Sequence, residues 1–163
     1  MRALSEAEIR AALVNAAPGE AERMPMPGLH EVVWADREYL GWRDPGAPHR
    51  GYLVFWRGEV AIGIAVRASE VRLRPGSAIC SMCTTTQPAS QVTMFSASRA
   101  GDAGRAGNSV GTYICADLAC SLLIRIAPPS FAGQPDAAQV VAERAAGLIA
   151  RVDAFAERVL ASA

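Results

Sequence analysis

The placement of four cysteines constrains this sequence more than any other feature. They form two close pairs, Cys80-Ser-Met-Cys83 and Cys115-Ala-Asp-Leu-Ala-Cys120, and residues 84–114 separate the pairs. A chain kept in a reducing compartment seldom maintains structural disulfides, so paired thiols at this spacing indicate a tetrahedral Zn²⁺ site with two thiolates from each pair. Four cysteine ligands leave no open position for water or substrate. Such a zinc ion is structural and not catalytic.

The residues around each pair predict how the sulfurs are brought together. The first pair follows a Pro75-Gly76 turn and has the spacing of a zinc knuckle. The second pair follows a short β-prone stretch, residues 112–114, and runs into a predicted helix from Asp117 to Ile126. A knuckle followed by a second pair at a helix N-terminus is the arrangement called a treble clef, in which the helix dipole favours thiolates. The four-residue spacer in the second pair departs from the usual two.

A thiol redox pair is the alternative interpretation of Cys80-Ser-Met-Cys83. Redox motifs of this spacing normally open a helix after a strand, and here a turn precedes the pair. A redox interpretation also leaves the second pair without a role. Zinc is therefore the favoured interpretation.

Patterns along the rest of the chain predict one α+β domain over residues 1–163, a usual length for a single domain. We expect an N-terminal helix and ordered loop in 1–48, an antiparallel sheet with the zinc finger in 49–127, and a long C-terminal helix in 135–161. Ser5 and Glu8 form a capping-box pattern for the first helix. The predicted strands are residues 52–56, 60–67, 71–74 and 91–96, the first two joined by a turn at Arg57-Gly58.

The C-terminal helix is predicted from one apolar stripe at steps of three and four residues. The stripe consists of Val141, Ala145, Leu148, Val152, Phe155 and Val159. We expect it to pack on the sheet of its own chain, and pairing with a second copy is the alternative.

Charge and hydropathy exclude several classes of protein. Sixteen Arg, with no Lys, balance sixteen acidic residues, so the chain is not a bulk polycation. Residues 45–125 nevertheless carry eight Arg against four acids, which indicates either an acidic partner surface or a solvated face. The longest apolar run, residues 60–66, is too short to cross a bilayer. Glu6 and Glu8 interrupt any export signal, so we expect a cytoplasmic protein without membrane contact.

The segment Arg99 to Asn108 repeats glycine at every third position and lacks the Gly-Lys-Ser/Thr ending of a P-loop. It is either a flexible connector or a mobile basic loop. As a basic loop it would offer Arg99 and Arg105 to carboxylates or phosphates, with Tyr113 and Arg125 flanking it.

Several motifs along the chain belong together. They are Glu8-Ile-Arg-Ala-Ala, Leu40-Gly-Trp-Arg-Asp-Pro45, Cys80-Ser-Met-Cys83, Ala97 to Gly107, Val110 to Ser121 and the closing helix Gly147 to Leu160. In these motifs the sequence resembles the elongation factor G-binding proteins, a FusB-like family with a fibronectin-binding-protein (FBP) C-terminal treble-clef zinc finger. The resemblance covers nearly the whole chain, and the segment from Gly111 to Ser121 is its most specific part.

The resemblance implies a structural zinc site at Cys80, Cys83, Cys115 and Cys120. It also implies binding to elongation factor G on the ribosome, release of stalled factor and, in some members, fusidic acid tolerance. A ribosomal-RNA-binding zinc module is the alternative function, motivated by the basic loop. An enzyme ranks last, because His30 and His49 stand in loops without a partnered nucleophile or base, and no small-molecule substrate is expected.

Overall fold

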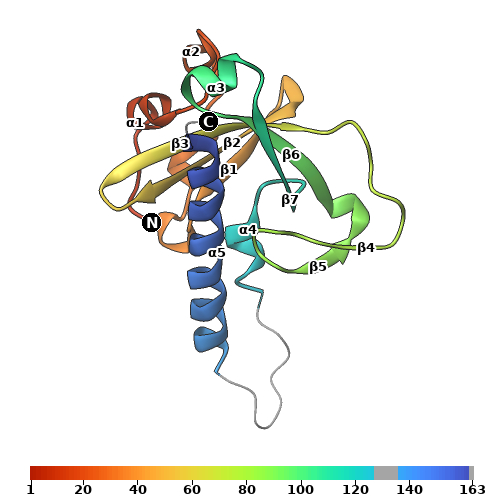
Figure 1. Cartoon of the computed structure of the whole chain (residues 1–163). Helices are drawn as coiled ribbons and strands as arrows, with labels where there is room; N and C mark the ends of the chain where they lie inside the picture. Colours follow the sequence, from red (N-terminus) through yellow and green to blue (C-terminus); the bar gives the residue numbers. More distant parts are fainter. Residues whose placement is uncertain (127–135, 162–163) are drawn as a thin grey trace.

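The computed structural model describes residues 1–126 and 136–161. Its centre is a five-stranded antiparallel sheet with the order β1-β2-β3-β6-β7, and a separate two-stranded hairpin consists of β4 and β5 (Figure 1). The predicted α+β class, with an antiparallel sheet and a long C-terminal helix, is confirmed. The strands are β1 Leu40–Asp44, β2 Ala47–Arg57, β3 Val60–Ala68, β4 Ser77–Ile79, β5 Thr86–Pro88, β6 Val92–Ser98 and β7 Ser109–Cys115.

Five α-helices and three single-turn 3-10 helices accompany the strands in the described parts of the chain. The α-helices are α1 Glu6–Ala12, α2 Glu20–Arg23, α3 Gly101–Arg105, α4 Cys120–Leu123 and α5 Ala137–Leu160; the 3-10 helices are η1 Leu29–Glu31, η2 Trp34–Asp36 and η3 Ala89–Gln91. The predicted capping box opens α1, because the Ser5 and Glu8 side chains each bond the other residue's backbone N–H. The Pro135 at which we predicted the last helix to open lies outside the described residues.

Both faces of the sheet are buried, and the alternation of β2 shows how. Leu53 and Phe55 point into one cluster, while Tyr52 and Val54 point into another. The zinc-side cluster lies under α5 and includes Tyr39, Leu53, Phe55, Ile64, Met82, Phe95, Ile114, Leu118, Leu148, Val152, Phe155 and the four cysteines. The N-terminal cluster lies under α1 and comprises Leu4, Ile9, Ala12, Met24, Leu40, Trp42, Tyr52 and Val54.

The stripe of α5 packs on the sheet of its own chain, as predicted. Leu148, Val152, Phe155 and Val159 are buried in the zinc-side cluster, and Figure 1 shows α5 running along that face. Arg57, at the end of β2, forms ion pairs with Asp153 and Glu157 of the helix at 2.8 and 2.7 Å. Among the described residues, no helix is long and apolar enough to cross a membrane.

Two strand predictions are wrong. The segment expected to be an ordered loop contains β1, whose alternating Leu40 and Trp42 are buried and pair with β2. The predicted strand 71–74 has no ladder partner, and residues 69–76 project from the body instead (the yellow-green loop of Figure 1). Val71 is 80% exposed. Leu73 is half-buried against the zinc-side cluster, so the alternation indicates burial correctly, but without a paired strand it does not make a ladder.

Candidate metal centre

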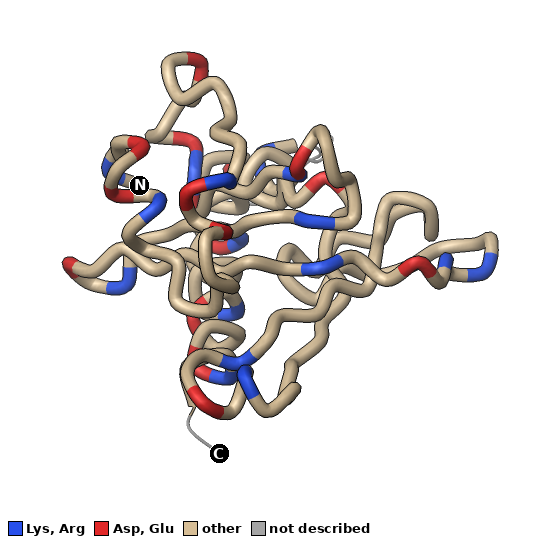
Figure 2. The backbone as a smooth tube through the Cα atoms, turned by 90° about the horizontal axis from the view of Figure 1, so that it is seen from above, with Lys and Arg blue, Asp and Glu red and all other residues tan. Residues whose placement is uncertain are grey.

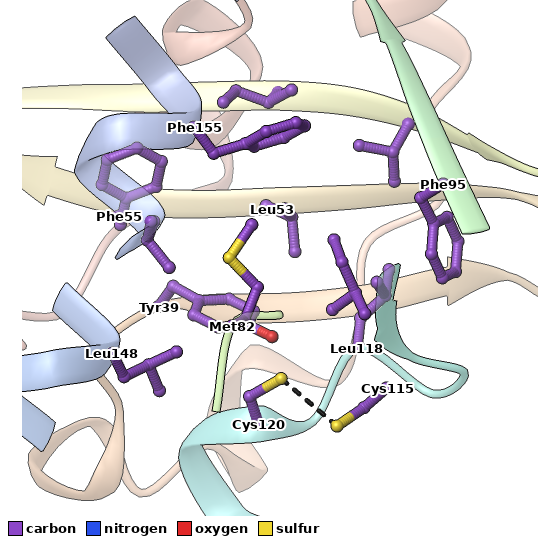
Figure 3. Close-up of a cluster of buried hydrophobic side chains, with 14 of the residues drawn as sticks. Tyr39, Leu53, Phe55, Met82, Phe95, Cys115, Leu118, Cys120, Leu148 and Phe155 are labelled. Atoms are coloured by element: carbon purple, nitrogen blue, oxygen red, sulfur yellow. Dashed lines mark hydrogen bonds between the residues drawn. The ribbon is translucent and has the colours of Figure 1, made fainter. Parts of the chain in front are cut away.

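The structure brings the sulfurs of Cys80, Cys83, Cys115 and Cys120 within 4.8 Å of one another. Sulfur-to-sulfur distances are 3.6 Å for Cys80 and Cys120, 3.6 Å for Cys83 and Cys115, and 3.3 Å for Cys115 and Cys120 (the dashed line in Figure 3). A disulfide would require about 2.05 Å. Four thiolates at about 2.3 Å from one tetrahedral ion would lie about 3.8 Å apart. The four side chains therefore fit zinc and do not form disulfides.

The first pair lies on a turn between β4 and β5. The backbone N–H groups of Met82 and Cys83 point at the sulfur of Cys80, with nitrogen-to-sulfur distances of 3.3 and 3.4 Å. Thr84 follows in the left-handed region, with φ of 58°, and its N–H donates to the carbonyl of Cys80 at 2.9 Å. This is the zinc knuckle predicted from the spacing, closed by local backbone bonds.

The second pair joins a strand to a helix. Cys115 is the last residue of β7, and Cys120 is the first residue of α4. The four-residue spacer makes a turn that puts Leu118 at a φ of 61° with its side chain fully buried. The predicted helix 117–126 is too long, since α4 spans only four residues. Its dipole is correspondingly small, so metal coordination and not the helix has to hold the thiolates.

The four thiols cannot all ionise by themselves. Contact with the Cys115 sulfur lowers the pKa of Cys80 to about 7, whereas contact with Cys115, then Cys80 and Cys83, raises the pKa of Cys120. The side-chain amide N–H of Gln87 points at the sulfur of Cys115, with a nitrogen-to-sulfur distance of 3.3 Å. A bound dication would let all four sulfurs be thiolates and leave a local charge of −2. That charge offsets part of the Arg excess in residues 45–125.

Two further contacts connect the knuckle to the rest of the fold. Arg151 of α5 donates to the carbonyl of Met82, and the N–H of Ser81 donates to the carbonyl of Tyr113 in β7 at 2.8 Å. The first contact also brings a positive charge to the edge of the metal site. The knuckle is therefore fixed by the sheet and by the long helix.

The predicted partner-binding residues do not share one surface. Arg105 pairs with Asp102 of its own helix, and Arg99 donates to the carbonyl of Ala161 at 3.3 Å. Tyr113 is 36% exposed in the middle of β7. Arg125 is engaged internally, because two of its nitrogens donate to Glu38 at 2.8 Å.

Arg125 does not flank the glycine-rich segment. Its neighbour Ile124 accepts a hydrogen bond from Arg144, whereas Ala100 donates to Val159 near the other end of α5. Fifteen helical residues between these contacts correspond to about 22 Å. The segment itself contains the short helix α3 and is not an open loop. Gly104 lies so close to the carbonyl of Arg99 that a side chain there would collide with it.

The structure points to four further residues that sequence analysis did not name as site residues. Arg72 and Arg74 are exposed on the projecting segment 69–76, and neither forms an ion pair within the part of the chain that the structure describes. Their alternation with apolar residues was the available signal, and it was interpreted as a strand. The contact of Gln87 with Cys115, and that of Ser121 with Tyr39, gave no signal in the sequence, because only the fold brings these residues together.

The sheet, the knuckle and the cluster of four sulfurs define a treble-clef zinc-finger protein. The chain belongs to the FBP C-terminal treble-clef zinc-finger family, whose model matches residues 8–159. Its four cysteines form a structural zinc site. One similar solved structure is that of the fusidic acid resistance protein FusC, at 19% identity and a TM-score of 0.47. That similarity covers 65% of this chain and 51% of FusC, so the chain spans about half of FusC's length. A search of curated proteins gave no match.

Proposed function

We propose that this protein is a non-enzymatic, zinc-containing adaptor that binds elongation factor G at or near the ribosome and modulates translation. The observation that carries the proposal is the family match over residues 8–159, together with the motifs that resemble elongation factor G-binding members. In this proposal the zinc ion shapes a docking domain. A cytoplasmic location belongs to the same proposal.

The burial of the metal site supports a role in docking. The four cysteines are 0 to 3% exposed, so neither the sulfurs nor a bound ion is open to a substrate. His30 and His49 are both exposed, and the nearest acidic atom recorded for His30 is that of Glu31 at 3.7 Å. Neither histidine is set in the buried, partnered geometry that general acid or base catalysis uses.

Exposed arginines supply the surface for an acidic partner. Figure 2 shows basic and acidic positions mixed along the backbone, both on the body and on the projecting segment 69–76. Arg72 and Arg74 on that segment add to Arg99 and Arg105 near α3. Planar guanidinium groups on exposed segments bind carboxylates in a bidentate manner, which suits the acidic surface of a protein partner.

The experiment is retention of elongation factor G by the immobilised full chain from a nuclease-treated bacterial lysate at low salt, beside a known family member. We expect retention by both. Failure of this chain while the family member succeeds would refute the proposal. Arg72→Glu with Arg74→Glu, and separately Arg99→Glu with Arg105→Glu, locate the surface. The control is Arg2→Glu, at an exposed arginine that pairs with Glu59 at the turn between β2 and β3, away from both surfaces.

Binding to ribosomal RNA is the competing outcome of the same experiment. If RNA were the partner, nuclease treatment would abolish retention, and affinity would fall steeply with salt because phosphate contacts release counterions. Growth of a fusidic-acid-sensitive strain that expresses the chain then shows whether binding extends to drug tolerance.

A further inference from the structure

The hydroxyl group of Tyr39 is buried without a hydrogen-bond partner among the residues that the structure describes. The residue is 1% exposed and packs in the zinc-side cluster. An unpaired hydroxyl in an apolar interior costs stability, and phenylalanine would fill the same space without that cost. A phenolic hydroxyl is a hydrogen-bond donor that carries its proton at neutral pH. Figure 3 shows the Cys120 sulfur on the side of the ring where the hydroxyl lies, so the metal site is where a partner for this proton is to be sought.

The backbone of Tyr39 is tied to the residue that follows Cys120. The hydroxyl oxygen of Ser121 accepts from the N–H groups of Glu38 and Tyr39 at 3.0 and 3.3 Å and donates to the carbonyl of Tyr39 at 3.2 Å. The ion pair between Glu38 and Arg125 holds the same two segments together. With the backbone fixed in this way, the ring enters the cluster and its hydroxyl points toward the sulfur of Cys120 (Figure 3).

The other sulfurs show why Cys120 needs this donor. Cys80 faces two backbone N–H groups, and Cys115 faces the amide of Gln87. Within residues 1–126 and 136–161, the hydrogen-bonding contacts of the Cys83 and Cys120 sulfurs are with other cysteine sulfurs, and of these two it is Cys120 that the Tyr39 hydroxyl faces (Figure 3). Hydrogen bonds to metal-bound thiolates draw charge off the sulfurs and help to hold the ligands in place. In a tetrathiolate site with a charge of −2, a sulfur without a donor is the weak point.

We propose that the Tyr39 hydroxyl donates a hydrogen bond to the metal-bound thiolate of Cys120 and so raises the affinity of the site for zinc. Tyr39 is a positioning residue in this role, because it acts on the metal through Cys120. The hydroxyl has its hydrogen-bond partner only when zinc is bound. Removing it therefore weakens zinc binding and does not destabilise the metal-free protein.

Tyr39→Phe tests the proposal, because it removes the hydroxyl and keeps the ring. In the full chain we expect zinc affinity, measured by chelator competition, to fall about tenfold. We also expect the sulfur-to-metal charge-transfer bands of the Co²⁺-substituted protein to shift, and the metal-free variant to be no less stable than the metal-free parent. The matched control is Tyr52→Phe, at an equally buried tyrosine (1% exposed) of the N-terminal cluster, which should leave affinity and spectrum unchanged.

An affinity and a Co²⁺ spectrum equal to those of Tyr52→Phe would overturn the proposal. If Tyr39→Phe does not fold, a measurement on the unmutated protein still tests the proposal. In protein loaded with NMR-active cadmium, we expect the Tyr39 hydroxyl proton to exchange slowly and to show scalar coupling to the metal through the Cys120 sulfur. A hydroxyl proton without such coupling would equally refute the proposal.

Discussion

The two faces of the central sheet are stabilised in different ways. On the zinc side, Cys80 and Cys83 lie on the turn between β4 and β5, which have three residues each, and Cys120 opens the four-residue α4, while Cys115 ends β7. On the N-terminal side, α1 has a capping box, Trp42 and Tyr52 pack their rings 5.3 Å apart, and the terminal ammonium group donates to two backbone carbonyls. Short elements bury little apolar surface and close few internal hydrogen bonds, so a metal ion substitutes for them.

Loss of one zinc ligand is the strongest way to break this comparison. Cys115→Ser leaves three thiolates, and we expect zinc content to fall and the β4–β5 hairpin, the end of β7 and α4 to unfold. Structural zinc contributes on the order of 10 kcal/mol or more to the folding of small zinc fingers, so this is the largest effect expected here. Hydrogen exchange by residue measures it, with protection lost in 77–88 and 113–123.

The N-terminal face supplies the control for that experiment. Amides that pair β1 with β2, and β2 with β3, should keep protection in Cys115→Ser, because the other face of these strands packs on the N-terminal cluster, which contains no cysteine. A variant that stays fully protected without metal would contradict the structural role of zinc. Uniform loss of protection would show instead that the two faces fold as one unit.

Truncation of an anchor on α5 separates helix packing from metal binding. Phe155 is 1% exposed in the zinc-side cluster, so Phe155→Ala should cost about 3 to 5 kcal/mol of unfolding free energy, with zinc content unchanged. Ile9→Ala on α1 should cost about 2 to 5 kcal/mol. Denaturation with and without a chelator compares the two variants further. The loss of unfolding free energy caused by Phe155→Ala should become smaller when zinc is removed, whereas the loss caused by Ile9→Ala should stay the same.

The ion pair between Glu38 and Arg125, on the zinc side, should stabilise the fold to a degree that depends on pH. Partial burial alone would raise the pKa of Glu38, but hydrogen bonds from Arg125 outweigh it, and Asp36 also lies 3.5 Å from Arg125. The pKa of Glu38 is thus lowered from its ordinary 4.5, so the pair stabilises the fold above that pH, and the contribution is lost as pH falls through the lowered value. Glu38→Gln should cost about 1 to 3 kcal/mol at pH 7, with a difference that narrows in acid.

A surface pair on the other face is the control for Glu38→Gln. Glu6 pairs with Arg10 at 2.7 Å on α1, but its side chain is 58% exposed, whereas that of Glu38 is 6% exposed. Glu6→Gln should therefore cost no more than about 0.5 kcal/mol. Thermal denaturation at several pH values compares the two variants. An equal, pH-independent cost for both would show that the Glu38 pair does not stabilise the fold by charge.

The sequence predicted correctly those elements whose pattern depends on residues close together in the chain. The cysteine spacing, the stripe of α5 and the turn between β2 and β3 each depend on residues within a few positions of one another, and each led to the right element. Strand β1 was missed because Gly41 weakens its alternation and Pro45 follows closely. The strand predicted at 71–74 had an adequate pattern, and Leu73 packs partly against the zinc-side cluster, but no neighbouring strand pairs with it, a condition set elsewhere in the chain.

The contacts that complete the metal site could not be predicted, because they join distant segments. Ser121 meets Tyr39 across 82 residues, and Gln87 meets Cys115 across 28. Arg125 was expected to face a partner, and its pairing with Glu38 depends on β1 lying beside α4. Sequence patterns indicate which residues are chemically able to bind, whereas burial decides whether they are free to do so.

The smallest effect is expected from loss of the capping box that the sequence predicts at the start of α1 and the structure contains. Ser5→Ala removes the hydroxyl that accepts from the N–H of Glu8, at 3.3 Å, at the start of α1. Loss of such a cap costs about 1 kcal/mol, and α1 closes only the N-terminal cluster. Urea denaturation should therefore show a slightly lower midpoint, while zinc affinity and exchange protection in residues 77–88 stay as in the parent. Weaker zinc binding in this variant would mean that the two faces are coupled through the sheet, and the division between a face that depends on metal and a face that does not would no longer hold.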